Sequence, residues 1–223
     1  MQRYRTPFSA MYWREAAKET HNTTMWLFAA LVTAMRIALK AVRIPLMQDL
    51  FITFGFLPNA LGSMVYGPVL ALLSAIVSDT VGALAFPVGP YFPPFALVEI
   101  MGSVIFAMFL YRAPVKIWRV AASKLTVSVL CNLFLTPIFL SWMSGNAAKI
   151  IVLPRIAKNV AMFPLESVML VLLIDALLPA LRRLGLVPQE RARLSLTACH
   201  FIMLGGMTAI AAACVFAYVR LSF

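Results

Sequence analysis

Long apolar runs, separated by short turns and basic blocks, constrain the fold of this chain more than any other feature. Hydrophobic residues make up 62% of the 223 residues and charged residues 12%, and the mean hydropathy is +0.91. This composition is typical of an integral membrane protein, and the runs lack the two-residue alternation of a membrane β-barrel. We therefore expect an all-α bundle of transmembrane helices in one compact unit.

The breaks between the apolar runs predict six core helices and a seventh apolar segment. Five of the core helices are expected at about 24–42, 50–66, 68–85, 95–111 and 150–181, and the remaining one ends near residue 143. This organisation divides the chain into a cytoplasmic amphipathic segment at 1–23, a six-helix domain at 24–183, a basic cytoplasmic loop at 184–195 and an additional transmembrane helix at 196–223.

The net charge of +11 comes from basic residues in short blocks between the apolar runs. That distribution is the topology signal of a membrane protein and does not indicate a nucleic-acid partner. It predicts a multi-pass membrane protein, surrounded by lipid, with its N-terminus in the cytoplasm. Arg43, Lys149 and Arg155 then fall on the outer side, against the usual charge rule, and call for a functional explanation.

A stretch rich in Pro and Gly interrupts the apolar helices at residues 86–95 and also carries four aromatic rings. Pro and Gly prevent a helix from running through it. Tyr91 and Phe92 lie at its centre. Two interpretations remain open, a rigid loop that covers a ligand pocket or a short turn whose rings anchor at the headgroup level.

The first core helix, at about 24–42, has two contrasting faces. At 100° per residue, Ala30, Ala34 and Ala38 share one narrow arc, and a basic stripe of Arg36, Lys40 and Arg43 lies about 150° away. A small-residue face allows another helix to approach closely, either in this chain or in a partner. The basic stripe can pair with buried acids or bind an anionic ligand, whereas Lys40 and Arg43 can also reach the surface by snorkelling.

Several charged residues fall deep in the predicted helices, where each charge costs about 2.5–3.5 kcal/mol. One interpretation is structural ion pairs, for example Arg36 with Asp79, and the other is a polar pocket open to the outer face. Arg155 and Lys158 share one helix face because they are three residues apart. The candidate ligand-binding residues are Arg36, Asp79, Glu99, Arg155 and Lys158, with Asn132, Trp142, Tyr91 and Phe92 as partners for a flat ring.

Motifs for catalysis, nucleotide hydrolysis and metal binding are absent from the sequence. It contains no Gly-rich phosphate loop, no HExxH pair and no G-x-S-x-G element. We therefore expect neither an enzyme nor a bound metal or cofactor, and no hydrolysis of ATP by this chain itself.

Three clustered motifs resemble the folate-specific substrate-binding (S) components of energy-coupling factor transporters. They are FGFLPNALGSMVYGP at 54–68, SDTVGALAFP at 78–87 and GPYFPPF at 89–95, and LPRIAK at 153–158 also looks like a family segment. The resemblance covers about residues 25–183. The chain departs from the family pattern at Pro94, Ala96, Val98 and Glu99, where Gly or small and hydroxyl residues are common.

The resemblance implies a six-helix bundle in the cell membrane of a prokaryote, which binds folate at the outer face. It also implies two kinds of partner, a transmembrane coupling subunit and two ATP-hydrolysing subunits. The Ala face of the first helix would contact the coupling subunit. Arg36, Arg155 and Lys158 would balance the glutamate carboxylates of folate, Asp79 would accept from the pterin, and Tyr91, Phe92 and Trp142 would hold the rings.

Three other functions remain open at this point. The ligand can be a different vitamin or metabolite, such as a thiamine-like or queuosine-like compound, and for a cationic ligand Glu99 and Asp79 would be the anchors. The chain can instead be a membrane scaffold without a ligand, which predicts a collapsed pocket. A carrier that works without an ATPase subunit is the third possibility.

Overall fold

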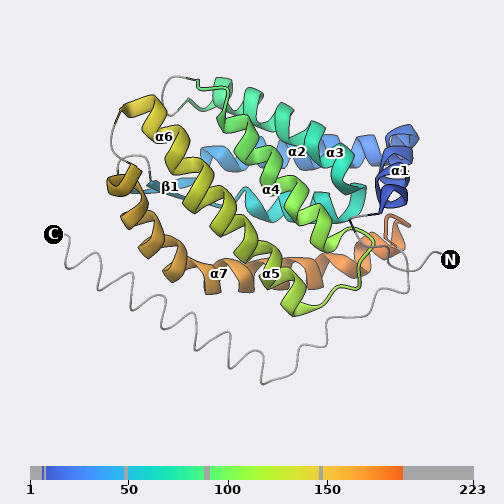
Figure 1. The fold of residues 1–223 in the computed structure, drawn as a ribbon. Coiled ribbons are helices and arrows are strands. Elements are labelled where there is room, and N and C mark those ends of the chain that lie inside the picture. The colour runs from blue at the N-terminus through green and yellow to red at the C-terminus, as the bar shows by residue number, and fades with distance from the viewer. Residues whose placement is uncertain (1–6, 8, 48–49, 88–90, 146–147, 188–223) are drawn as a thin grey trace.

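The protein is a bundle of helices with a short helix at one end and a β-hairpin at the other (Figure 1). The computed structural model describes residues 7, 9–47, 50–87, 91–145 and 148–187. Its helices are α1 (Ala10–Lys18), η1 (Glu19–His21), α2 (Thr23–Ala41), α3 (Phe56–Ala85), α4 (Phe95–Leu110), α5 (Ile117–Val127), η2 (Ser128–Leu135), α6 (Thr136–Ser144) and α7 (Ala148–Arg183). The predicted helix at 196–223 and most of the loop at 184–195 lie outside the described residues.

Within these residues, four helical stretches are long and apolar enough to cross a membrane. They are Thr23–Ala41, Phe56–Ala85, Ile117–Ser144 and Pro154–Arg183, and Phe95–Leu110 is a shorter apolar helix. Large apolar side chains such as Leu27, Leu84 and Phe134 point outward and are more than half exposed. Lipid can cover such faces without cost, so the architecture confirms the expected all-α membrane bundle.

The long helix α3 is divided by a kink at Gly67, at the break expected between the helices at 50–66 and 68–85. Gly67 has φ 78° and ψ −178°, a conformation that is essentially confined to glycine. The two halves, residues 56–66 and 68–85, together with α2, α4, the α5–α6 stretch and α7, make up the six expected core helices.

Replacing Gly67 by Ala is expected to destabilise the bundle. An added Cβ would lie 2.9 Å from Cζ of Tyr111, and the positive φ would be strained besides. Strain of this kind costs about 1–3 kcal/mol before the clash is counted. Thermal unfolding in detergent measures the loss. Gly55→Ala is the matched control, because Gly55 has φ −60° and nothing within 4 Å of an added Cβ. Equal melting temperatures for the two variants would contradict this account of the kink.

The prediction for residues 43–66 was wrong at its start, because a β-hairpin replaces the expected loop and first helical turns. β1 (Arg43–Met47) pairs antiparallel with β2 (Leu50–Thr53), and α3 begins only at Phe56. Pro58 falls in the first turn of α3, where the backbone N–H groups have no helical partner and Pro is tolerated. Arg43 steadies the hairpin, since its guanidinium donates to the Phe86 carbonyl at 3.1 Å and lies 5.8 Å from the centre of the Phe51 ring.

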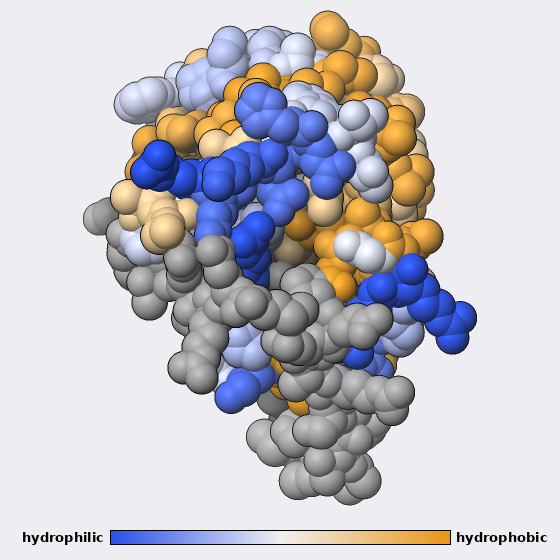
Figure 2. Space-filling view, turned by 90° about the vertical axis from the view of Figure 1, so that its right-hand side faces the viewer, coloured by the Kyte–Doolittle hydropathy of each residue, from blue (hydrophilic) through white to orange (hydrophobic). Residues whose placement is uncertain are grey.

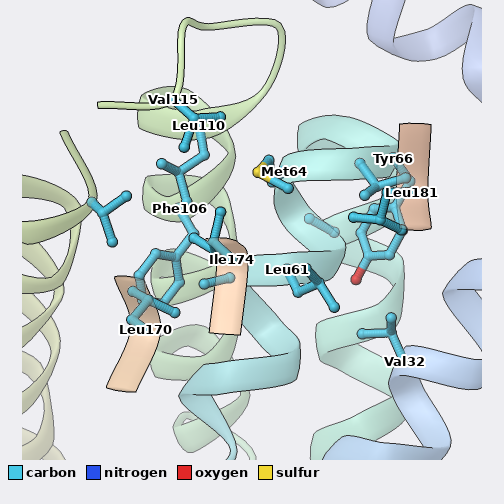
Figure 3. Packing of buried hydrophobic residues seen from close by; sticks show 14 of the residues in the cluster. Val32, Leu61, Met64, Tyr66, Phe106, Leu110, Val115, Leu170, Ile174 and Leu181 are labelled. Atoms are coloured by element: carbon cyan, nitrogen blue, oxygen red, sulfur yellow. The ribbon is translucent and has the colours of Figure 1, made fainter. Parts of the chain in front are cut away.

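The apolar core lies where α3, α4 and α7 meet, and α2 joins it through Val32. Phe106, Ile174 and Leu170 face one another there, and Met64 and Leu61 of α3 complete the group (Figure 3). Tyr66, Phe106 and Leu170 are fully buried. This packing holds α3, α4 and α7 together on the side of the bundle away from the hairpin.

Helix α1 docks on the end of α4 through a small apolar contact and an ion-pair network. Tyr12 is buried and donates to the Ala107 carbonyl at 3.0 Å. Arg112 bridges Glu15 at 2.6 Å and Glu19 at 3.0 Å. Burial raises the pKa of Tyr111 to about 12, against the opposing effect of Arg112, so its hydroxyl remains protonated and donates to Glu19. Hydrophilic side chains gather on this end of the molecule, flanked by apolar surface (Figure 2).

Candidate functional site: a charged cavity at the hairpin end

A cavity of about 480 Å³ opens at the end of the bundle opposite to α1. Its walls come from the C-terminal part of α2, both ends of α3, the start of α4, the α5–α6 stretch and the first half of α7. Thr53 and Phe51 of the hairpin and Tyr91 and Phe92 of the aromatic stretch also line it. This volume is in the range typical of small-molecule sites.

One side of the cavity, which we call the balanced wall, consists of two cations and two carboxylates from α2, α3 and α4. Arg36 Nη2 lies 2.5 Å from Glu99 Oε2, and Lys40 Nζ lies 3.2 Å from Asp79 Oδ1 and 3.6 Å from Glu99 Oε1. The ion pair suggested from the sequence, Arg36 with Asp79, is therefore not formed. Arg36 pairs with Glu99 instead, and Lys40 pairs with Asp79.

Neutral side chains hold this wall in place. Arg36 is 2% exposed and donates through Nη1 to Ser103 Oγ at 3.3 Å. Ser103 Oγ in turn lies 2.8 Å from Asn59 Oδ1 and from the Glu99 carbonyl. Buried hydrogen bonds of this kind fix the guanidinium in one orientation, since leaving it unpaired would be costly.

The opposite side, the α7 wall, is formed by Arg155 and Lys158 with the amides of Asn132 and Asn159. Asn132 donates to Asn159 at 3.1 Å, and Asn159 donates to the Arg155 carbonyl at 2.8 Å. In the described part of the chain, Lys158 has no hydrogen-bond or ion-pair partner.

A buried ion pair forms the floor between these walls. Lys124 Nζ lies 3.0 Å from Glu166 Oε2, and both side chains are almost completely buried. The ammonium also lies 4.1 Å from the centre of the Phe56 ring, a cation–π contact.

The structure brings together eight of the nine predicted ligand-binding residues. The cavity is lined by Arg36, Asp79, Tyr91, Phe92, Glu99, Asn132, Arg155 and Lys158. Trp142 does not line it, since its side chain is 71% exposed and its ring lies 5.9 Å from that of Phe139.

Sequence reasoning missed three cations of the cavity: Lys40, Arg43 and Lys124. Lys40 and Arg43 were visible as a stripe with Arg36, but snorkelling to the surface was the default explanation for these two residues. The signal for Lys124 was a lysine within an apolar helix, which needs an acid such as Glu166 nearby.

The small-residue face of α2 is exposed along its length. Ala30, Ala34 and Ala38 all lie on the outside of the bundle, so this face does not pack on another described helix of the chain. Among the described residues, no cluster of His, Cys, Asp or Glu side chains could hold a metal ion.

No family model matches the chain, whereas curated proteins do. Over 119 residues it is 37% identical to the folate transporter FolT of Clostridium novyi (strain NT), an alignment that covers 53% of this chain and 69% of that protein. The chain belongs to the FolT family. A second FolT, from Leuconostoc mesenteroides subsp. mesenteroides, is 27% identical over 151 residues, which cover 65% of this chain and 81% of that relative.

The fold agrees with the FolT assignment. A crystal structure of FolT bound with folic acid matches 66% of this chain and 89% of that chain, with a TM-score of 0.60 and 32% sequence identity. The resemblance read from the motifs at 54–68, 78–87 and 89–95 is thereby confirmed.

Proposed function

We propose that this chain is the membrane-embedded substrate-binding subunit of an ATP-driven vitamin uptake transporter, and that it captures folate or a related pterin. The observation that carries the proposal is the charge of the cavity in a chain of the FolT family. Six basic side chains line the cavity, but only three acidic ones do. Folate carries two carboxylates at one end, so a positive excess of this size complements it.

The parts of folate find matching groups in the cavity. The glutamate carboxylates would bind at the α7 wall, near Arg155 and Lys158. The flat rings would pack against Tyr91 and Phe92, which line the cavity. Asn132 offers an amide to polar atoms of the ligand. We do not assign Trp142 to this site, because its ring lies outside the cavity.

A cationic, thiamine-like ligand fits the cavity less well. Glu99 and Asp79 would have to anchor it, but both carboxylates already pair with Arg36 and Lys40. A scaffold without a ligand is also disfavoured, since the cavity is open.

Two features of the chain indicate its partners, the missing phosphate-binding loop and the exposed alanine face of α2. The sequence contains no phosphate-binding loop, so two ATPase subunits would supply the energy. A transmembrane coupling subunit would pack on the exposed face formed by Ala30, Ala34 and Ala38, where small side chains permit close helix contact. The chain itself acts by binding and not by catalysis.

The orientation in the membrane follows the basic residues. Arg14, Lys18 and Arg112 lie at the α1 end, and Lys116, at the start of α5, is close to Arg112 in the chain. An excess of Lys and Arg marks the cytoplasmic side, so we place the N-terminus inside and the cavity at the outer face.

Direct titration of the purified, full-length protein with folate tests this proposal. We expect saturable binding in the micromolar range or tighter by isothermal titration calorimetry, and no competition by thiamine. Absence of folate binding, together with binding of another vitamin, would overturn the folate assignment. Uptake by cells that lack every ATPase subunit of this transporter type would favour a stand-alone carrier.

A further inference from the structure

Glu99 of α4 occupies a position where a ligand carboxylate would otherwise be expected. Its Oε2 lies 2.5 Å from Arg36 Nη2 and its Oε1 lies 3.6 Å from Lys40 Nζ. About a third of its side chain is exposed, and it lines the cavity. The protein thus supplies its own counter-anion to the two cations that α2 directs into the site.

The carboxylates of the balanced wall already offset the charges of Arg36 and Lys40. Nη1 of Arg36 is bound to Ser103, and Lys40 also pairs with Asp79 at 3.2 Å. Lys40 reaches Asp79 by lying against Gly82, where an added Cβ would be 2.5 Å from Lys40 Cδ. A ligand carboxylate that bound here would either lie beside the like charges of Glu99 and Asp79 or displace Glu99, which would leave a carboxylate unpaired in a partly desolvated site.

The positive excess of the cavity therefore lies elsewhere. The balanced wall contributes two cations and two carboxylates, and Lys124 pairs with Glu166 on the floor. Lys158 on the α7 wall also lines the cavity, and among the described residues it has no ion-pair partner. Anionic groups of a ligand are drawn to that side.

We propose that Glu99 is a specificity-determining residue that sets the orientation of the ligand in the cavity, which we call the polarity of the cavity. It keeps Arg36 and Lys40 from the ligand carboxylates, so the dianionic end of the ligand binds at the α7 wall. The ring end, which carries N–H donors, then faces the Glu99 carboxylate. This inference rests on the proposed function, and it assigns Arg36 to holding Glu99 instead of the glutamate tail of folate.

The test separates the two ends of the ligand by competition against labelled folate. The methyl ester of pteroate, called pteroate below, carries the pterin and no ionised carboxylate, and p-aminobenzoylglutamate carries the glutamate without the pterin. In Glu99→Gln, we expect pteroate to bind about tenfold more weakly or worse, because a hydrogen bond to a charged acceptor is lost. Binding of p-aminobenzoylglutamate should become tighter, since Arg36 and Lys40 gain an uncompensated charge.

Lys158→Gln is the matched variant on the opposite wall and should show the reverse pattern. We expect it to weaken p-aminobenzoylglutamate by about tenfold and to leave pteroate unchanged. This variant also carries the test if Glu99→Gln cannot be purified in folded form. A gain of affinity in Glu99→Gln is informative because damage to the fold does not produce it.

The outcomes distinguish this inference from the proposed function. Unchanged or tighter pteroate binding in Glu99→Gln would overturn the polarity, and so would weaker pteroate binding in Lys158→Gln. If the unmodified protein binds neither folate nor pteroate nor p-aminobenzoylglutamate, the proposed function itself fails.

Discussion

Replacing Lys124 by Met is expected to lower the free energy of unfolding by about 3–5 kcal/mol, or the melting temperature by roughly 6–20 °C. The loss arises because Glu166 would be left as an unpaired carboxylate, 6% exposed, between α5 and α7. The contact of the ammonium with the Phe56 ring would also be lost. Thermal unfolding of the ligand-free protein in detergent measures the change.

Two further variants identify the cause of that loss. In Lys124→Met combined with Glu166→Met, both charges are removed, so most of the stability should return. Lys116→Met is the control on the same helix, because Lys116 is exposed at the N-cap of α5 and its loss should change little. A double variant that is as unstable as the single one would show that the ion pair is not responsible.

Replacing Ala34 by Phe is expected to abolish folate uptake by cells while folate binding by the purified subunit stays intact. Ala34 is exposed on α2, between Ala30 and Ala38 and away from the cavity. A phenyl ring there would hold a partner helix at a distance and remove the close packing that a small-residue face permits. Uptake of labelled folate and calorimetric titration of the same variant provide the comparison.

Ala176→Phe on α7 is the matched control, since it adds the same ring to another exposed alanine. Its uptake should remain near that of the unmodified protein. If Ala34→Phe transports normally, the proposed contact of this face of α2 with a coupling subunit is ruled out. If it loses binding as well, the substitution disturbs the bundle itself.

The number of core helices could be predicted because each break carries a strong local signal. Gly67 requires a positive φ, and Gly145 adopts the left-handed conformation that ends α6. The hairpin was missed because Leu50–Thr53 is only four residues long, too short to show a helical or strand period. Pro58 was the one sequence signal of the later helix start, because Pro is favoured in the first turn of a helix.

The π-helical segment Ser128–Leu135 had no signal in the sequence. In a π-helix each backbone hydrogen bond joins residues five apart instead of four. At the end of this segment, Thr136 Oγ1 also donates to the Cys131 carbonyl at 2.8 Å. Such local rearrangements depend on packing between helices and on the competition between side chains and backbone for the same carbonyl.

For the site, the sequence located the charges but could not pair them. Arg36 and Lys40 lie one turn apart, and either could reach Asp79. The outcome depends on how α4 is placed beside α2, which puts Glu99 within reach of both cations. Trp142 was misplaced for a related reason, because the rotation of α6 about its axis directs the ring outward.

Helix α2 carries the cations of the balanced wall on one side and the exposed alanines on the other. If a second membrane subunit docks on those alanines, a shift of α2 would reach the bound vitamin through a single contact, the pairing of Arg36 and Lys40 with Glu99. Linkage then demands reciprocity, so whatever factor docking changes in vitamin affinity, the vitamin must change in docking affinity. A loaded and an empty subunit would compete unequally for the same transporter core.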